Sequence, residues 1–171
     1  MKLYNAYVKN TNVVLEKMEE LQKDADNNAY LLGELGRRFS FEYNGMRNHE
    51  IYFSCLEGGQ KDINTKSTLY KKIVRDFGSY EIWLQRFKLL AMTRGIGWAV
   101  LWYDKKADRL INSWIDEQHL GQLSECVPVI ALDMWEHAFV SDYAPSGKKQ
   151  YIEDFMANVN WSAVESRLSQ A

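Results

Sequence analysis

The sequence predicts an α+β protein: an N-terminal antiparallel helical hairpin followed by a C-terminal half with a three-stranded antiparallel sheet and helices. Three observations favour this class. Only 2 prolines occur in 171 residues, which favours long uninterrupted elements. Apolar residues recur at helical intervals through the first third of the chain. From residue 95 onward the pattern changes to short apolar runs separated by polar turns. Helices and strands that are segregated along the chain are typical of α+β proteins.

The hairpin is predicted from two long amphipathic stretches. Over residues 4–21 apolar side chains recur at intervals of three, four and seven, as on one face of a helix. Residues 23–28 form a polar break, and a second helix is expected from about Ala29 to Leu56, with Ser40 as a candidate interruption. Two such helices joined by a short polar loop pack antiparallel.

The polar segment 57–67, with Gly58 and Gly59, is the best internal boundary. It predicts an N-terminal helical hairpin domain over residues 1–58 and a C-terminal α+β domain over residues 67–171. Within the second domain the spacing predicts helices over 67–76, 80–92, 150–158 and 162–169, and strands over 98–103, 109–115 and 127–132.

Composition excludes several classes of protein. Hydrophobic residues make up 46% and aromatic residues 13% of the chain, so a ring-rich globular core is expected. A net charge of −2 gives no general attraction to nucleic acid or to an anionic membrane, and the apolar run 127–132 is too short to span a bilayer. Two cysteines and an N-terminus without a secretory signal favour free thiols and a cytoplasmic location.

The candidate chemistry lies in the scarce histidines His49, His119 and His137. His137 follows Asp133 by four residues, directly after the apolar run 127–132, so the pair can offer a carboxylate and an imidazole to one metal ion. Iron, manganese and zinc accept these donors, and the lack of nearby cysteines argues against zinc fingers and iron–sulfur clusters. The alternatives are a surface helix pair for Asp133 and His137, and a hydrogen-bonded core histidine for His49.

Four segments in one order resemble the iron/manganese superoxide dismutase family. PVIALDMWEHAF (128–139) resembles its Asp-x-Trp-Glu-His-Ala-aromatic signature, and NHEIYF (48–53) resembles its Asn-His-x-x-aromatic-aromatic motif. GIGWA (95–99) resembles its Gly-x-Gly-Trp strand start, and YIEDFMANVNW (151–161) resembles its C-terminal helix and Val-Asn-Trp turn. The resemblance covers nearly the whole chain and implies the same helical hairpin and α+β half.

The resemblance implies one manganese or iron ion per subunit, held by three histidines, one aspartate and a solvent molecule. By motif match His49, Asp133 and His137 are three of the ligands. The remaining histidine precedes the tyrosine matched by Tyr7 by eight residues, which falls upstream of Met1. Three interpretations stay open: the chain begins at an internal methionine, the protein is a homologue that lost a ligand, or His119 substitutes.

The resemblance also implies the residues around the ligands. Tyr7 matches a tyrosine at the substrate funnel, and Gln118 matches the glutamine that contacts the bound solvent in manganese enzymes. Iron enzymes supply that glutamine at the position of Gly45, so the pair Gly45 and Gln118 leans towards manganese. His119 is one residue away, and a shift of one residue would exchange the two assignments. Each of these residues could instead be an ordinary loop or core residue.

Trp98 and Trp135 match the aromatic walls of the site, and Glu136 matches a bridge to the ligand histidine of a second subunit. The resemblance therefore implies a homodimer through the region of Glu136 and His137. The family has a histidine at Leu3 and a tyrosine at Val140 that meet across this dimer. Both positions are apolar here, which indicates a coordinated change at the interface.

These residues predict an antioxidant oxidoreductase that disproportionates superoxide to O₂ and H₂O₂ by cycling between M(III) and M(II). Its partners would be superoxide and a second copy of the chain, with no nucleic acid and no membrane. The rival prediction is a dimer of the same fold that binds metal weakly or not at all, and has no activity, because one histidine ligand is missing. A zinc hydrolase is a further alternative, but no nucleophile or general base accompanies the two histidines and the carboxylate.

Overall fold

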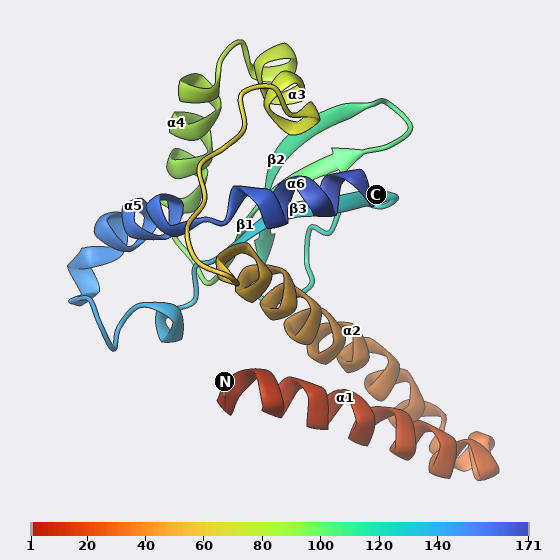
Figure 1. Cartoon of the computed structure of the whole chain (residues 1–171). Helices are drawn as coiled ribbons and strands as arrows, with labels where there is room; N and C mark the ends of the chain where they lie inside the picture. Colours follow the sequence, from red (N-terminus) through yellow and green to blue (C-terminus); the bar gives the residue numbers. More distant parts are fainter. Residues whose placement is uncertain (1, 171) are drawn as a thin grey trace.

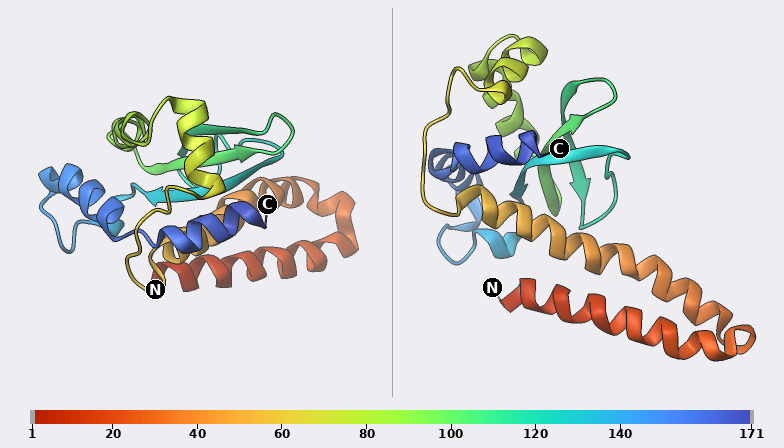
Figure 2. Two further views of the ribbon diagram at one scale, coloured as in Figure 1. Left: turned by 45° about the horizontal axis from the view of Figure 1, so that its top comes forward. Right: turned by 45° about the vertical axis from the view of Figure 1, so that its right-hand side comes forward.

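The computed structural model describes residues 2–170 (Figure 1). The N-terminal third consists of helix α1 (Lys2–Leu21), a 3₁₀ turn η1 (Gln22–Asp24) and helix α2 (Ala25–Leu56). The two helices lie side by side and run in opposite directions, and the hairpin projects away from the rest of the molecule (Figure 2). The predicted helical hairpin is confirmed.

The break between the helices is shorter than the sequence predicts. The polar stretch was expected to reach residue 28, yet α2 begins at Ala25. Asn27 donates to the Asp24 carboxylate at 3.0 Å, and Asn28 donates to the Asp24 backbone carbonyl at 2.8 Å, so these polar side chains stabilise the start of the helix. The expected interruption at Ser40 is also absent, because its hydroxyl donates to the carbonyl of Arg37 at 3.2 Å within the helix.

The C-terminal half is the predicted α+β unit. Its strands form one antiparallel sheet in the order β2-β1-β3. The pairing places Trp98, at the start of β1, opposite Asp133, at the end of β3. The elements are α3 (Thr68–Phe77), α4 (Tyr80–Ala91), β1 (Gly97–Asp104), β2 (Arg109–Asp116), β3 (Cys126–Asp133), the short 3₁₀ helices η2 (Glu136–Ala138) and η3 (Pro145–Gly147), α5 (Lys148–Asn158) and α6 (Trp161–Ser169).

The sheet lies between two groups of helices. Figure 2 shows α3 and α4 on one side of it and the α1–α2 hairpin on the other, with α6 beside β3. Alternate residues of β1 follow this arrangement: Ala99 and Leu101 pack in a cluster that includes Trp83 and Phe87 of α4. Trp98, Val100 and Trp102 form a second cluster, against which Ile51 and Tyr52 of α2 pack.

Helix α2 is therefore the element that joins both halves. It packs against β3, and residue Lys61 of the connecting segment pairs with Asn160 just before α6. The division into domains 1–58 and 67–171 stays a prediction. Within residues 2–170, no helix is both long enough and apolar enough to cross a membrane.

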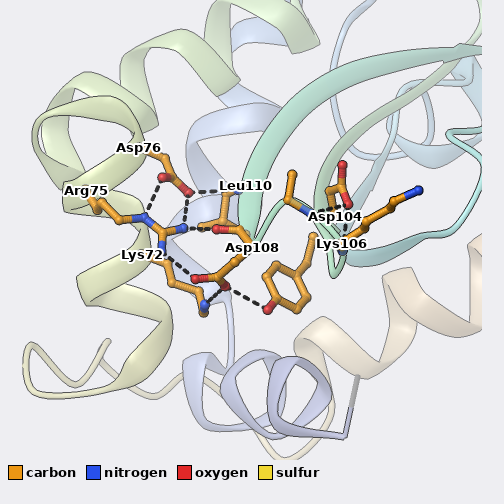
Figure 3. A network of polar contacts seen from close by, with 9 residues as sticks. Lys72, Arg75, Asp76, Asp104, Lys106, Asp108 and Leu110 are labelled. Carbon is orange, nitrogen blue, oxygen red and sulfur yellow. Dashed lines mark hydrogen bonds and ion pairs between the residues drawn. The ribbon is translucent and has the colours of Figure 1, made fainter.

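A polar network ties α3 to the turn between β1 and β2 (Figure 3). Arg75 lies between Asp76 and Asp108, at 2.7 Å from a carboxylate oxygen of each. Asp76 also accepts from the backbone N–H of Leu110 at 2.8 Å, and Tyr103 donates to Asp108 at 2.8 Å. The network holds the far end of the hairpin β1–β2, away from the cluster of histidines described next.

Candidate metal centre

Three predicted ligands come together from two elements and a turn. His49 lies on α2, Asp133 ends β3, and His137 lies in η2. One donor atom of each lies within 4.8 Å of the others, and in the described residues 2–170 these three form the only such group. The Asp133–His137 spacing therefore does not belong to an α-helix: a strand end and a 3₁₀ turn bring the side chains together.

The donor atoms of both histidines are directed at the carboxylate. Nε2 of His137 lies 3.2 Å and Nε2 of His49 lies 3.5 Å from Oδ2 of Asp133. The second distance is too long for a hydrogen bond, so Nε2 of His49 is buried without a hydrogen-bond partner. A buried nitrogen lone pair beside a buried carboxylate oxygen fits a cation between them.

The tautomer of His49 is set by the backbone. Its Nδ1 lies 2.6 Å from the carbonyl of Gly45, so Nδ1 carries the proton and Nε2 offers its lone pair. Burial lowers the pKa of His49, against the opposing charge of Asp133, and this favours the neutral imidazole that metals bind. Two imidazoles and one carboxylate are a donor set that iron and manganese accept.

Asp133 is held at both its side chain and its backbone. Its side chain is 2% exposed, and Oδ1 accepts from the backbone N–H of Trp135 at 3.0 Å. Tyr151 of α5 donates from its hydroxyl to the Asp133 carbonyl at 2.8 Å. These bonds leave Oδ2 directed towards the histidines, and they bring α5 into the support of the site.

A hydrogen-bonded chain lies beside the three candidate ligands. Gln118 is fully buried; its Nε2 donates to the hydroxyl of Tyr7 at 2.9 Å, and its Oε1 accepts from Nε1 of Trp98 at 2.9 Å. Burial, with the charges of Glu42 and Asp133, raises the pKa of Tyr7 to about 12, so the phenol keeps its proton at neutral pH.

The loop that carries Gln118 is anchored from three sides. Glu117 has a left-handed backbone (φ 52°), and its N–H donates to the carbonyl of Ile96 at 3.0 Å. Its carbonyl accepts from Nε1 of Trp135 at 3.1 Å. Asn48, the neighbour of His49, donates to the carbonyl of Gln118 at 3.0 Å. The loop is thus fixed to the segments that precede β1 and follow β3, at one end of the sheet, and to α2.

The remaining predicted residues differ in their distance from the cluster. Trp98 meets the ring of His49 edge-on at 5.0 Å, and Trp135 stacks on His137 at 5.8 Å between centroids. Glu136 is exposed. His119 packs against Phe41 at 5.6 Å, has a buried Nδ1 without a hydrogen-bond partner, and does not belong to the group of metal-ligating side chains.

Sequence reasoning did not assign roles to Asn48 and Tyr151 or to the carbonyl of Gly45. Asn48 stands next to His49 in the motif, and a polar residue inside an apolar helix face was the available signal. Gly45 is also where the ring of Tyr7 packs: a Cβ added there would lie 2.6 Å from two ring carbons. The sequence shows the glycine but not its contact with α1.

The three candidate ligands line a cavity of about 450 Å³ beside the first turn of α1. Its wall includes Leu3 and Tyr4 on the α1 side and Tyr52 and Phe53 on α2. Asp133, His49 and His137 form its floor. The position that the resemblance gives to the remaining histidine ligand precedes Met1 and lies outside the sequence.

Comparison with known proteins agrees with this arrangement. Residues 65–167 match the model of the iron/manganese superoxide dismutases, C-terminal domain. A relative in Cupriavidus metallidurans named superoxide dismutase [Fe] is 34% identical over 98% of this chain and 83% of its own length. One in Mycobacterium leprae named superoxide dismutase [Mn] is 34% identical over 99% of this chain and 81% of its own length. One in Aquifex pyrophilus, named superoxide dismutase [Fe], is 32% identical over 98% of this chain and 79% of its own.

The C-terminal domain model matches more than half of the chain, and these relatives align with nearly all of it. The chain belongs to the iron/manganese superoxide dismutase family.

Proposed function

We propose that this chain binds one manganese or iron ion through His49, Asp133 and His137 and disproportionates superoxide to O₂ and H₂O₂. The observation that carries the proposal is the unpartnered buried Nε2 of His49, which faces the same carboxylate oxygen as Nε2 of His137. When bound, the ion supplies one-electron redox chemistry, in which M(III)/M(II) alternation oxidises one superoxide and reduces the next.

The side chains around the ligands have separate tasks in this proposal. Gly45 holds His49 in the tautomer that offers Nε2, and Trp98 holds the amide of Gln118 in one orientation. Gln118 and Tyr7 form the polar line along which the two protons needed for each H₂O₂ are delivered. Trp98 and Trp135 exclude bulk water from the site, which strengthens the field of the remaining polar groups.

Manganese is the metal that this arrangement favours. The ring of Tyr7 fills the space that a side chain at position 45 would need. The glutamine of the site therefore comes from Gln118 on the loop after β2, the source implied for manganese enzymes. Gln118 tunes the proton affinity of a solvent molecule at the centre, and so the potential at which the centre works.

We further propose a homodimer built around Glu136 and His137. Glu136 is exposed. Nε2 of His137 faces the carboxylate of Asp133, so its Nδ1 is left to donate to an acceptor on a second subunit. Leu3 and Val140 are 46% and 47% exposed, as expected of apolar side chains that a partner covers. The free cysteines Cys55 and Cys126 support a reducing, cytoplasmic setting.

The test is the metal content of the chain, measured by plasma mass spectrometry after expression with iron and manganese both present. We expect close to one ion per chain, and we expect the metal-loaded protein to remove superoxide. In His137→Ala the affinity for the metal should fall by more than ~100-fold. His119→Ala is the matched control, since His119 lies outside the cluster and its loss should leave the metal content unchanged.

Two results would contradict the proposal. Little metal in the unaltered chain favours the rival function, a dimer of this fold without catalytic activity. Loss of metal in His119→Ala alone would make His119 a ligand and would displace the three-residue assignment.

A further inference from the structure

The hairpin contains a buried carboxylate that the proposed function does not use. Glu42 of α2 has a side chain that is 6% exposed, and both of its oxygens are occupied. Arg38, four residues earlier, donates to Oε1 at 2.9 Å, and Asn10 of α1 donates to Oε2 at 3.3 Å. A buried carboxylate needs such partners, and here one of them belongs to the opposite helix.

The contact between Asn10 and Glu42 lies one helical turn from the contact of Tyr7. Asn10 follows Tyr7 by three residues on α1, and Glu42 precedes Gly45 by three residues on α2. Side chains three apart share a helix face. Because the helices run antiparallel, the Tyr7–Gly45 contact and the Asn10–Glu42 contact are successive steps along one interface.

An aromatic side chain connects the two steps. Phe41, next to Glu42, packs against the ring of Tyr7 at 6.1 Å and against His119 at 5.6 Å. The guanidinium of Arg38 lies 3.8 Å from the centroid of Phe41 while it binds Glu42. The ion pair therefore holds the ring that supports Tyr7 from the side of α2.

We infer that Glu42 is a positioning residue for Tyr7: its bond to Asn10 fixes the separation of α1 and α2 at which the Tyr7 hydroxyl reaches Gln118. The effect of Glu42 on catalysis rests on the proposed function, whereas the positioning of the Tyr7 hydroxyl does not. The hydroxyl meets Nε2 of Gln118 at 2.9 Å, so a displacement of α1 by about 1 Å would break the bond.

A role in stability alone is separable from this positioning. Removing one partner of an ion pair is costly when the other charge stays buried, but Arg38 is 53% exposed, so its guanidinium stays hydrated without Glu42. Glu42→Met should therefore fold while it removes the polar bond between the helices. Glu42→Gln keeps an acceptor for Asn10 and should restore the wild-type position. Glu34→Met is the matched control, because Glu34 pairs with Arg37 on the same helix but is 45% exposed and makes that contact within α2.

The direct readout is the ¹⁹F NMR signal of Tyr7 in the metal-free chain labelled with 3-fluorotyrosine, assigned by its loss in Tyr7→Phe. We expect the Tyr7 signal to shift or broaden in Glu42→Met, to return to its wild-type position in Glu42→Gln, and to stay unchanged in Glu34→Met. In the metal-loaded protein we expect roughly tenfold slower superoxide removal for Glu42→Met at unchanged metal content.

A Tyr7 signal that stays at the wild-type position in Glu42→Met overturns the inference, whatever the activity. If Glu42→Met does not fold, Asn10→Ala decides the question, since Asn10 is exposed and its loss removes the same bond; an unmoved signal there overturns it as well. If the Tyr7 signal shifts in Glu42→Met but the unaltered chain does not remove superoxide, the positioning role is supported and only the proposed function is contradicted.

Discussion

The outer part of the helical hairpin and the three-stranded sheet differ sharply in how much each element buries. Along α1 only Thr11 and Val14 are buried, and every buried residue of α2 lies at Glu42 or beyond. In β1, by contrast, all residues from Gly97 to Trp102 are buried. The same chain thus contains one region held by two facing helices and another enclosed from both sides.

The candidate metal centre lies where these regions meet. His49 belongs to the buried half of α2, and Asp133 ends a strand whose last residues are all buried. Tyr7, however, belongs to α1, a helix of 20 residues of which only two are buried. Regions with few buried apolar contacts open more readily than the core. We therefore expect the candidate ligands to be held more firmly than Tyr7, and the predictions below test the difference in packing between the two regions.

The largest effect is expected in the sheet half. Phe87 of α4 is fully buried and packs against Trp83 at 5.6 Å, so Phe87→Ala should lower the free energy of unfolding by about 3–5 kcal/mol. Leu31, on the outer part of α2, is 50% exposed, and Leu31→Ala should change the free energy of unfolding by less than ~0.5 kcal/mol. Denaturant unfolding followed by circular dichroism measures both. Equal losses would show that the hairpin is as well packed as the sheet.

An intermediate effect is expected from two glycines of the same helix. A Cβ at Gly45 would lie 2.6 Å from the ring of Tyr7, so Gly45→Ala should destabilise the protein by about 1–3 kcal/mol and displace that ring. A Cβ at Gly33 would meet nothing within 4 Å, and Gly33→Ala should stabilise the helix by about 0.5–1 kcal/mol. Thermal unfolding of the two variants should therefore shift in opposite directions. A higher melting temperature in Gly45→Ala, as expected for Gly33→Ala, would contradict the close contact between Tyr7 and Gly45.

The smallest effect is expected at the polar network of α3 and the β1–β2 turn. Hydrogen bonds from Lys72, Arg75 and Tyr103 hold the pKa of Asp108 well below its usual range. A depressed pKa in the folded state stabilises the protein above the unfolded value, near pH 4, and this stabilisation is lost as the pH falls through the folded value.

Asp108→Asn should therefore lower the melting temperature slightly at pH 7, and the difference from wild type should narrow in strong acid. Asn tolerates the left-handed backbone at this position (φ 48°), so the substitution tests the charge alone. The exposed setting limits the effect, because water and salt screen such pairs. A difference that grows as the pH falls below 4 would contradict the assignment.

The elements could be predicted from the sequence because periodicity is local, and the three candidate ligands were predicted by motif match to the family. The start of α2 was not, since Asp24, Asn27 and Asn28 read as a loop until their bonds to one another are known. The strand order β2-β1-β3 was not either, because three antiparallel strands with similar apolar runs admit other orders. Glu42 reads as a surface residue on any helix, and only its bond to Asn10 sets it apart.

Arg167 of α6 makes hydrogen bonds that connect this helix to an edge strand of the sheet and to α2. Its guanidinium donates to the backbone carbonyl of Val129 in β3 and to the hydroxyl of Ser54 in α2. Since β3 lies at the edge of the sheet, its outward carbonyls are the groups that a foreign strand would pair with. Arg167 binds a carbonyl of this edge strand with a side chain that cannot extend the sheet. Helix α6 thus covers part of the edge strand that carries Asp133 to the candidate metal centre.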